Sequence, residues 1–368
     1  MASTRLRRTI MAASLALAAG AAFACSDRSE VTAPPDGPAL ARGGVQGPDL
    51  RAALAAKARY TDRLLAEEGV VGTAVGLGHQ GNAVVKVYLA RPGAKVARSL
   101  DGVDVETVVT GEIRAILPSA TPEAAGADPT QRFARPVSIG VSAGNLNDLV
   151  YYRTFCTTGT LGARLKGANT KYYALSNNHV FAVENLAKVG DPIIQPGQAD
   201  NGCRSTAADQ IGTLAGYVSL NFSRKGTNTV DAAAAAVTTG TVGNQTPGNG
   251  YGTPSPTTRT AALNMAVQKY GRTTVLTHGS VTGVDASIKV RYSKGNTATF
   301  VHQIVITGNN GGAFSDSGDS GSLIVTDDSG KNPVGLLFAG STSTTIANPI
   351  SDVLSQLGKK LGTTLTIE

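Results

Sequence analysis

A serine lies at the centre of the short polar stretch Gly318-Asp319-Ser320-Gly321, which precedes an apolar run. Small polar clusters between apolar runs are usually loops, so taken alone this stretch is a turn more often than an active site. A serine hydroxyl becomes a useful nucleophile only when a base takes its proton, and histidine suits this role at neutral pH. The interpretation of Ser320 therefore depends on which histidines and carboxylates the chain supplies.

The four histidines differ in their sequence surroundings. His79, His278 and His302 have no distinctive setting and are interpreted as structural or turn residues. His179 follows a β-like run in YYALSNNHVFA and is the candidate base, although a lone histidine in such a place is structural more often than not. Asp231 begins the apolar run VDAAAAAV and is the candidate carboxylate, with a strand-start or turn aspartate as the alternative. An acid beside five alanines is costly to bury unless it is paired.

The order of the three candidates along the chain is informative. His179, Asp231 and Ser320 occur as His, Asp, Ser, each at the edge of a β-like run. An α/β-hydrolase has the order Ser, Asp, His and the nucleophile motif G-x-S-x-G. No histidine follows Ser320, and Ser322 occupies the final glycine position of that motif. The sequence therefore excludes that class.

Several segments of residues 137–368 resemble the trypsin/chymotrypsin superfamily of double-β-barrel serine proteases, bacterial exported type. GDSGSLIV is similar to the family signature G-D-S-G-G-P, and YALSNNHVF and VDAAAAAV are similar to the segments that carry its histidine and aspartate. FCTTGTLGARL, YGRTTVLTHGSVTG and PVGLLFAGS resemble the strand before the histidine, a turn of bacterial members and the strand that lines the substrate cleft. The resemblance implies a mainly β, chymotrypsin-like double six-stranded β-barrel and a serine endopeptidase.

Carried over position by position, the resemblance implies a catalytic set of three side chains. His179 would be general base and then acid, Asp231 its orienting carboxylate and Ser320 the nucleophile. The backbone N–H groups of Gly318 and Ser320 would form the oxyanion hole, where one donor is worth about 2.7–4 kcal/mol. Asp319 would be a buried acid that holds the loop. We expect a polypeptide substrate, no cofactor and no metal.

The expected substrate pocket departs from the family pattern. Phe314 stands where trypsin-like members hold an acid, so cleavage after Lys or Arg is not expected. A small or apolar residue before the scissile bond is the better prediction. Phe338 and Gly340 fall in the cleft strand. Phe338 replaces the serine that supports the catalytic aspartate in the family, which leaves open what solvates Asp231.

The N-terminus indicates export. A basic start precedes an apolar run that is too short for a membrane span, and small residues allow cleavage after Ala24. Residues 1–24 are therefore interpreted as a signal peptide and residues 25–47 as a flexible tether. Cys25 would become the first residue, an arrangement that resembles the lipobox of bacterial lipoproteins. Lipid anchoring to the cell envelope and ordinary secretion both stay open.

The three cysteines leave one odd thiol in an exported chain. If Cys25 carries lipid, Cys156 and Cys203 remain as a pair in an oxidising compartment. A disulfide that closes this loop of about 47 residues would stabilise the fold by about 4 kcal/mol. Two buried free thiols are the alternative. The resemblance supports the pairing, because Cys156 keeps the family position whereas Val180 stands where its usual partner follows the histidine.

The rest of the sequence outlines the domains. Residues 48–117 show a helical pattern and three β-like runs, which predict a small α/β domain. Residues 118–136 are rich in Pro and Ala and are interpreted as a linker. Residues 137–368 contain many short β-like runs, which indicate the protease domain, and residues 349–362 predict a short helix near its end. The α/β domain is either a removable pro-region that assists folding or blocks the cleft, or a permanent accessory domain.

Charge limits the partners of the protein. The formal net charge is +7, but three arginines belong to the export signal and the remaining charges are scattered, which is no footprint for nucleic acid. A catalytically inactive, protease-like binding or scaffold protein of the cell surface is the second hypothesis. Retention of the complete set His179, Asp231 and Ser320 argues against it, since an inactive copy has no chemical need for all three.

Overall fold

The computed structural model describes residues 48–115 and 127–368 of the 368-residue chain. The expected signal peptide, Cys25, the tether and part of the expected linker lie outside these residues. The described part is mainly β, which confirms the predicted fold class. No helix within it has the length and apolar character needed to span a membrane.

The N-terminal part has the predicted α/β character. One helix is followed by short strands: α1 Pro48–Ala66, β1 Val70–Leu77, β2 Ala83–Leu89, β3 Ser99–Leu100 and β4 Val103–Val109. Strand β1 pairs antiparallel with β2, and β2 pairs parallel with β4. The apolar side of α1 packs on these strands through Ala56 and Leu64, which are buried together with Val85 and Val87 of β2.

The first barrel contains six strands, one of them bent. The strands are β5 Ser142–Asn145, β6 Gly159–Thr160 with β7 Ala163–Gly167, β8 Tyr172–Ser176, β9 Pro192–Ile194, β10 Gln210–Tyr217 and β12 Ala233–Val237. The pairings run β5–β6, β7–β8, β8–β12, β12–β10, β10–β9 and β9–β5. Because β6 and β7 are consecutive parts of one bent strand, these pairings close the sheet into a barrel.

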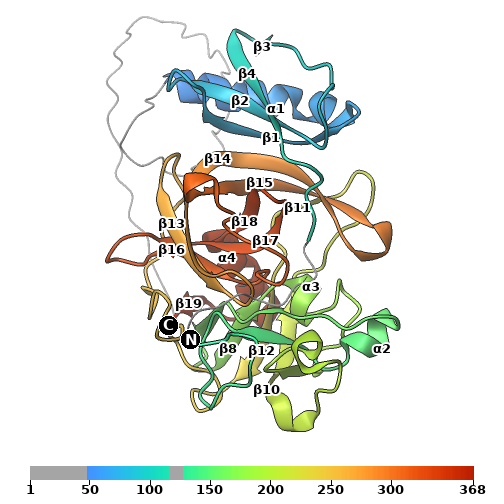
Figure 1. The fold of residues 1–368 in the computed structure, drawn as a ribbon, viewed down its shortest axis with the longest axis vertical. Helices are drawn as coiled ribbons and strands as arrows, with labels where there is room; N and C mark the ends of the chain where they lie inside the picture. The colour runs from blue at the N-terminus through green and yellow to red at the C-terminus, as the bar shows by residue number, and fades with distance from the viewer. Residues whose placement is uncertain (1–47, 116–126) are drawn as a thin grey trace, which may run out of the picture. The chain divides into compact units, whose positions relative to one another are not determined.

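The second barrel repeats this arrangement. Its strands are β13 Ala266–Gly271, β14 Val275–Arg291, β15 Thr297–Gly308, β16 Leu323–Thr326, β17 Pro333–Gly340 and β18 Thr345–Pro349. The pairings β13–β14, β14–β15, β15–β18, β18–β17, β17–β16 and β16–β13 close it (Figure 1). In both barrels the first strand pairs with the second and fourth and the third pairs with the sixth, which confirms the predicted double six-stranded barrel.

Short elements complete the structure. These are α2 Asp148–Tyr152, α3 Asn178–Phe181, β11 Thr227–Asn228, α4 Ile350–Leu361, β19 Leu365–Ile367 and the 3-10 turns η1 Gln198–Asn201, η2 Ala207–Asp209, η3 Ser293–Gly295 and η4 Asn309–Gly311. Helix α4 is the predicted C-terminal helix. Its buried residues Val353 and Leu357 join a core cluster with Leu165 of β7 and Leu336 of β17, so both barrels contribute to one core.

The N-terminal strands and the second barrel share one sheet. Strand β1 pairs antiparallel with β14, with Gly72 opposite Ile288 and Thr73 opposite Ser287 (Figure 1). Lys57 of α1 is buried and lies 3.2 Å from Asp285. Burial lowers the pKa of the Lys57 ammonium, and Asp285 opposes this effect. The N-terminal part is thus joined to β14 by main-chain pairing and by a buried ion pair.

Candidate active site

His179 and Asp231 form a buried pair on the first barrel. His179 lies in α3, directly after β8, and Asp231 lies just before β12, the strand that pairs with β8. Nδ1 of His179 is 2.7 Å from Oδ2 of Asp231, and the two side chains are 1% and 0% exposed. The main-chain N–H of His179 also donates to Oδ1 of Asp231 over 3.2 Å. The alanines after Asp231 alternate between two core clusters, so small side chains allow β12 to be buried on both faces.

The second barrel also holds Asp231. The hydroxyl of Tyr292, just after β14, donates to Oδ2 of Asp231 over 2.7 Å. Burial and the negative charge of Asp231 raise the pKa of the Tyr292 hydroxyl well above its usual value, so it stays a proton donor. The Asp231 N–H donates to Oδ1 of Asn348 over 2.9 Å, and Asn177 donates to the Asp231 carbonyl over 2.7 Å. The Tyr292 hydroxyl and the main-chain N–H of His179 thus solvate the Asp231 carboxylate, whereas the bonds with Asn348 and Asn177 hold its main chain.

Ser320 lies where the second barrel meets this pair. Its carbonyl accepts a 2.8 Å hydrogen bond from the N–H of Thr160 in β6. A Cβ placed on the neighbouring Gly159 would lie 2.5 Å from the side chain of Val180 and 2.9 Å from the Ser320 carbonyl oxygen. Since Val180 follows His179, helix α3 and the loop of residues 317–322, here called the Ser320 loop, converge on Gly159.

The hydroxyl of Ser320 and the imidazole of His179 are both buried and both available. The Ser320 hydroxyl donates only a long hydrogen bond, 3.4 Å, to the carbonyl of Phe338. Nε2 of His179 is buried and has no hydrogen-bond partner within residues 48–115 and 127–368. The Ser320 hydroxyl and Nε2 of His179 are therefore not hydrogen-bonded to each other within these residues. Catalytic hydrogen bonds are often long or poorly aligned without substrate, so proton transfer from the serine to Nε2 would require the two groups to approach.

The loop before Ser320 aims two main-chain N–H groups. The Ser317 carbonyl accepts from the Thr273 hydroxyl, and the Asp319 carbonyl accepts from the N–H of Ser322 over 2.9 Å. Because a trans peptide points its N–H away from its C=O, these bonds fix the N–H groups of Gly318 and Ser320. Neither N–H donates to an acceptor in the described part of the chain. Gly318 has φ +96° and no room for a Cβ, so only glycine fits there.

Asp319 is the buried acid that holds this loop. Oδ1 accepts from the N–H of Thr273 over 2.8 Å, and Oδ2 accepts from the Thr274 hydroxyl over 2.6 Å. Lys269 of β13 lies 3.6 Å from Oδ2, and both side chains are fully buried. Burial lowers the pKa of the Lys269 ammonium, an effect that the charge of Asp319 opposes. A buried charge pair thus anchors the Ser320 loop to the second barrel.

The chain is similar to known proteins over part of its length. A family model for the Nal1 C-terminal domain matches residues 256–348, and no curated protein matches the chain. Among solved structures, Protease A of Thermobifida fusca is 19% identical with a TM-score of 0.42, over 63% of this chain and 100% of that one. The Nocardiopsis protease is 16% identical with a TM-score of 0.41 and the same two coverages. Cellulomonas bogoriensis chymotrypsin is 21% identical with a TM-score of 0.36, over 57% of this chain and 90% of that one.

The identities and TM-scores are low, so the fold assignment depends on the strand pairing common to the two barrels. The chain has the trypsin-like fold. The histidine and aspartate lie on the first barrel of this trypsin-like fold and the serine on the second. None of the three comparisons assigns a role to these residues.

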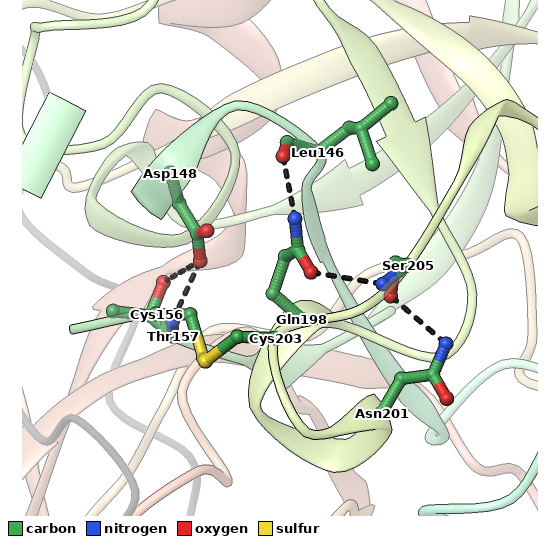
Figure 2. Close-up of a disulfide and its surroundings, with 8 residues drawn as sticks. All are labelled: Leu146, Asp148, Cys156, Thr157, Gln198, Asn201, Cys203 and Ser205. Carbon is green, nitrogen blue, oxygen red and sulfur yellow. Dashed lines mark hydrogen bonds between the residues drawn. A yellow bond between two sulfur atoms is a disulfide. The ribbon is translucent and has the colours of Figure 1, made fainter. Parts of the chain in front are cut away.

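The trypsin-like domain contains a disulfide between Cys156 and Cys203 (Figure 2). It joins the segment before β6 to the turn after η1. Gln198 of η1 supports this turn by accepting from the Ser205 N–H over 3.1 Å and by donating to the Leu146 carbonyl over 2.7 Å. The disulfide thereby fixes two loops of the first barrel.

A buried carboxylate lies beside the disulfide. Oδ2 of Asp148 accepts from the N–H and the hydroxyl of Thr157, over 2.6 and 2.8 Å (Figure 2). Its other oxygen has no hydrogen-bond partner among the described residues. Burial raises the pKa of Asp148 to about 6, and the bonds from Thr157 limit this rise.

The three predicted pocket residues lie in different surroundings. Phe314 is 2% exposed and belongs to a core cluster with Val281 and Ile306. Phe338 is fully buried in another cluster, and its ring lies 4.6 Å from that of Phe300. Gly340 forms main-chain hydrogen bonds with the N-terminal part of the chain. A role of these residues in substrate selection stays a prediction.

Tyr292, Asn348 and Lys269 were missed by sequence reasoning. Tyr292 lies in VRYSKGN and Asn348 in IANPI, and neither segment resembles a family motif. Lys269 lies in an otherwise uncharged stretch, AVQKYG, which forms a strand buried on both sides of that residue. A charge inside a predicted core strand was the one signal that could have pointed to a buried partner.

Proposed function

We propose that the protein is an exported serine endopeptidase that hydrolyses peptide bonds through an acyl-enzyme. The observation that carries the proposal is the buried His179–Asp231 pair, in which Nδ1 is engaged and Nε2 has no partner within the described residues. The N–H groups of Gly318 and Ser320, which donate to no acceptor in the described part of the chain, support it.

In the proposed reaction the Ser320 hydroxyl gives its proton to Nε2 of His179 as Oγ bonds to the peptide carbonyl carbon. Asp231 keeps the imidazole oriented and stabilises its protonated form, and Tyr292 stabilises the carboxylate charge. The N–H groups of Gly318 and Ser320 would stabilise the oxyanion. His179 then protonates the leaving amine as the C–N bond breaks, and a water activated by the same base releases the acyl group.

Labelling with a fluorophosphonate probe tests this proposal. The wild-type protein should react at Ser320, and Ser320→Ala should not. Ser355→Ala removes an exposed serine of α4 and should label like the wild type. Asp231→Asn should slow peptide hydrolysis by about 10⁴-fold, because the imidazole would take the wrong tautomer. Correctly folded wild-type protein that stays unlabelled would favour the inactive scaffold instead.

We propose an oxidising location for the protein because it has a disulfide. The exported chain would be cleaved after Ala24 and anchored through lipid on Cys25, residues outside the described structure. Cell fractionation of Cys25→Ser tests the anchor, because this change should move the protein from the membrane fraction to the soluble one. Equal membrane association of both proteins would favour secretion or another anchor.

A further inference from the structure

The segment Ile113–Ala115 of the N-terminal part occupies a strand position beside the candidate active site. The Arg114 N–H donates to the Gly340 carbonyl over 3.0 Å, and the Gly340 N–H donates back to the Arg114 carbonyl over 2.9 Å. On its other side, the Arg291 N–H donates to the Ile113 carbonyl over 2.9 Å and the Ala115 N–H donates to the Arg291 carbonyl over 3.0 Å. The segment therefore fills a slot between the ends of β17 and β14.

The edge of β17 that it covers is the edge that faces the nucleophile. Leu337 is the last residue of β17 that pairs with the barrel on that side, since its N–H donates to the Ser322 carbonyl over 3.0 Å and its carbonyl accepts from the Gly321 N–H over 2.9 Å. The register of β17 shifts between Leu337 and Ala339, and this extra residue turns the main-chain groups of Gly340 to the same edge as those of Leu337. The carbonyl of Phe338 is the acceptor of the Ser320 hydroxyl.

The direction of the pairing matches what a peptide substrate would need. Arg114 pairs antiparallel with Gly340. A peptide that continued in this register would run from Gly340 toward Phe338, and so toward Ser320. Extended peptides commonly bind proteins by adding a strand to an open sheet edge, with main-chain bonds for affinity and alternate side chains for specificity.

The side chains of the segment alternate as a bound peptide's would. Ile113 is 1% exposed and belongs to the buried cluster that includes Phe338 and Tyr292, and Ala115 is also buried. The Arg114 side chain between them is 58% exposed. The slot thus holds an apolar residue and a small residue two positions apart and leaves the intervening side chain in solvent.

We propose that Ile113–Ala115 is a built-in competitor of the substrate, which occupies the polypeptide-binding edge of β17 until it is displaced. The proposal rests on the proposed endopeptidase activity, and it assigns the substrate class as extended polypeptide with the pattern apolar, variable, small. Because the segment is tethered, its effective concentration is on the order of millimolar or higher, so free substrate competes poorly.

Two substitutions of Arg114 in the full chain distinguish the contribution of its main-chain hydrogen bonds from that of its side chain. Arg114→Pro removes the N–H that donates to Gly340, whereas Arg114→Ala keeps both main-chain bonds and removes only an exposed side chain. We expect Arg114→Pro to hydrolyse fluorescein-labelled casein about tenfold faster than the wild type, the factor that one lost hydrogen bond corresponds to. Arg114→Ala should stay within about twofold of the wild type, because an exposed ion pair contributes little.

A second pair of variants covers the case in which Arg114→Pro does not fold. Ile113→Ala removes most of the buried side chain of the segment and should also accelerate casein hydrolysis. Ile113→Val keeps most of this side chain and should accelerate hydrolysis much less. Fluorophosphonate labelling of Ser320 confirms that each variant is folded. If labelled Arg114→Pro and Ile113→Ala both hydrolyse casein at the wild-type rate, the proposal is wrong.

Hydrogen exchange distinguishes failure of this proposal from failure of the proposed activity. The amide of Gly340 should be protected in the wild type and in Arg114→Ala, and it should exchange faster in Arg114→Pro. If a protein shows this exchange pattern but does not react with the probe, the proposed endopeptidase activity is wrong and the occupation of the β17 edge still holds. A Gly340 amide that exchanges as fast as an unpaired amide in the wild type would overturn the occupied edge itself.

Discussion

The hydroxyl of Tyr292 and Nδ1 of His179 each lie 2.7 Å from Oδ2 of Asp231. One carboxylate oxygen therefore joins a tyrosine of the second barrel to a histidine of the first. Within the described structure, the charge of Asp231 is stabilised by donors from both barrels.

Tyr292→Phe should weaken this stabilisation while keeping the packing of the ring. A hydrogen bond to a buried charged group contributes about 1.5–3 kcal/mol, so we expect kcat/KM to fall by roughly 10- to 100-fold. The acidic limb of the pH–rate profile should move to higher pH, because a less stabilised carboxylate holds the protonated imidazole more strongly. Tyr173→Phe is the control, since among the described residues its hydroxyl is hydrogen-bonded only to Asn169. An unchanged pH profile in Tyr292→Phe would assign the tyrosine a purely structural role.

Lys269→Met should disorder the Ser320 loop, because the charge of Asp319 would stay buried without the ammonium of Lys269. Breaking a buried ion pair costs about 3–5 kcal/mol, which urea unfolding can measure. The variant should also lose reactivity with the fluorophosphonate probe. Lys57→Met breaks another buried ion pair, in the N-terminal part, and should keep the reactivity of Ser320. Full probe reactivity in Lys269→Met would show that the loop does not need this pair.

Asp148 should make stability depend on pH. Burial raises the pKa of this carboxyl from 3.8 to about 6 in the folded protein, so the folded state favours the protonated form. Its contribution to stability is complete below pH 3.8 and is lost as the pH rises through about 6. Asp148→Asn should therefore be more stable than the wild type at pH 8, by about 3 kcal/mol, and nearly equal to it at pH 4. Thermal unfolding at both pH values checks this, and an advantage independent of pH would contradict it.

The disulfide should contribute a large part of the stability of the first barrel. Replacing both Cys156 and Cys203 by serine should lower the free energy of unfolding by about 4 kcal/mol, measured in urea without reductant. Dithiothreitol should destabilise the wild type similarly and leave the double variant unchanged. Cys25→Ser should have no effect on unfolding. A double variant as stable as the wild type would mean that the loop between the two cysteines is already fixed by its other contacts.

Much of the fold could be predicted because the sequence signals are local. The helical pattern after residue 48 and the three β-like runs correspond closely to α1, β1, β2 and β4, and the C-terminal pattern corresponds to α4. Alternation, capping and turn residues act over a few positions, so they can be read from a short window. The double barrel required the additional information of the order in which the motifs occur.

The contacts that complete the site could not be predicted, because they join residues far apart in the sequence. Tyr292 reaches Asp231 across 61 positions, and Lys269 lies 50 positions before Asp319. The pairing of β1 with β14 has the same cause: any β-like run can pair with any open edge, and the sequence does not say which. The surroundings of Phe314 could not be predicted either, because an ungapped count gives a position along the chain and not the direction of the side chain.

The counter-charge of Asp319 is the side chain of an internal residue of β13 and not a chain end. Ordering of the Ser320 loop therefore does not have to wait for a cut that creates a new terminus. In the proposed endopeptidase, latency would come from the occupied edge of β17 rather than from an unfinished loop. Such an edge can be vacated and filled again, so a silent state could return without any chemical change to the chain.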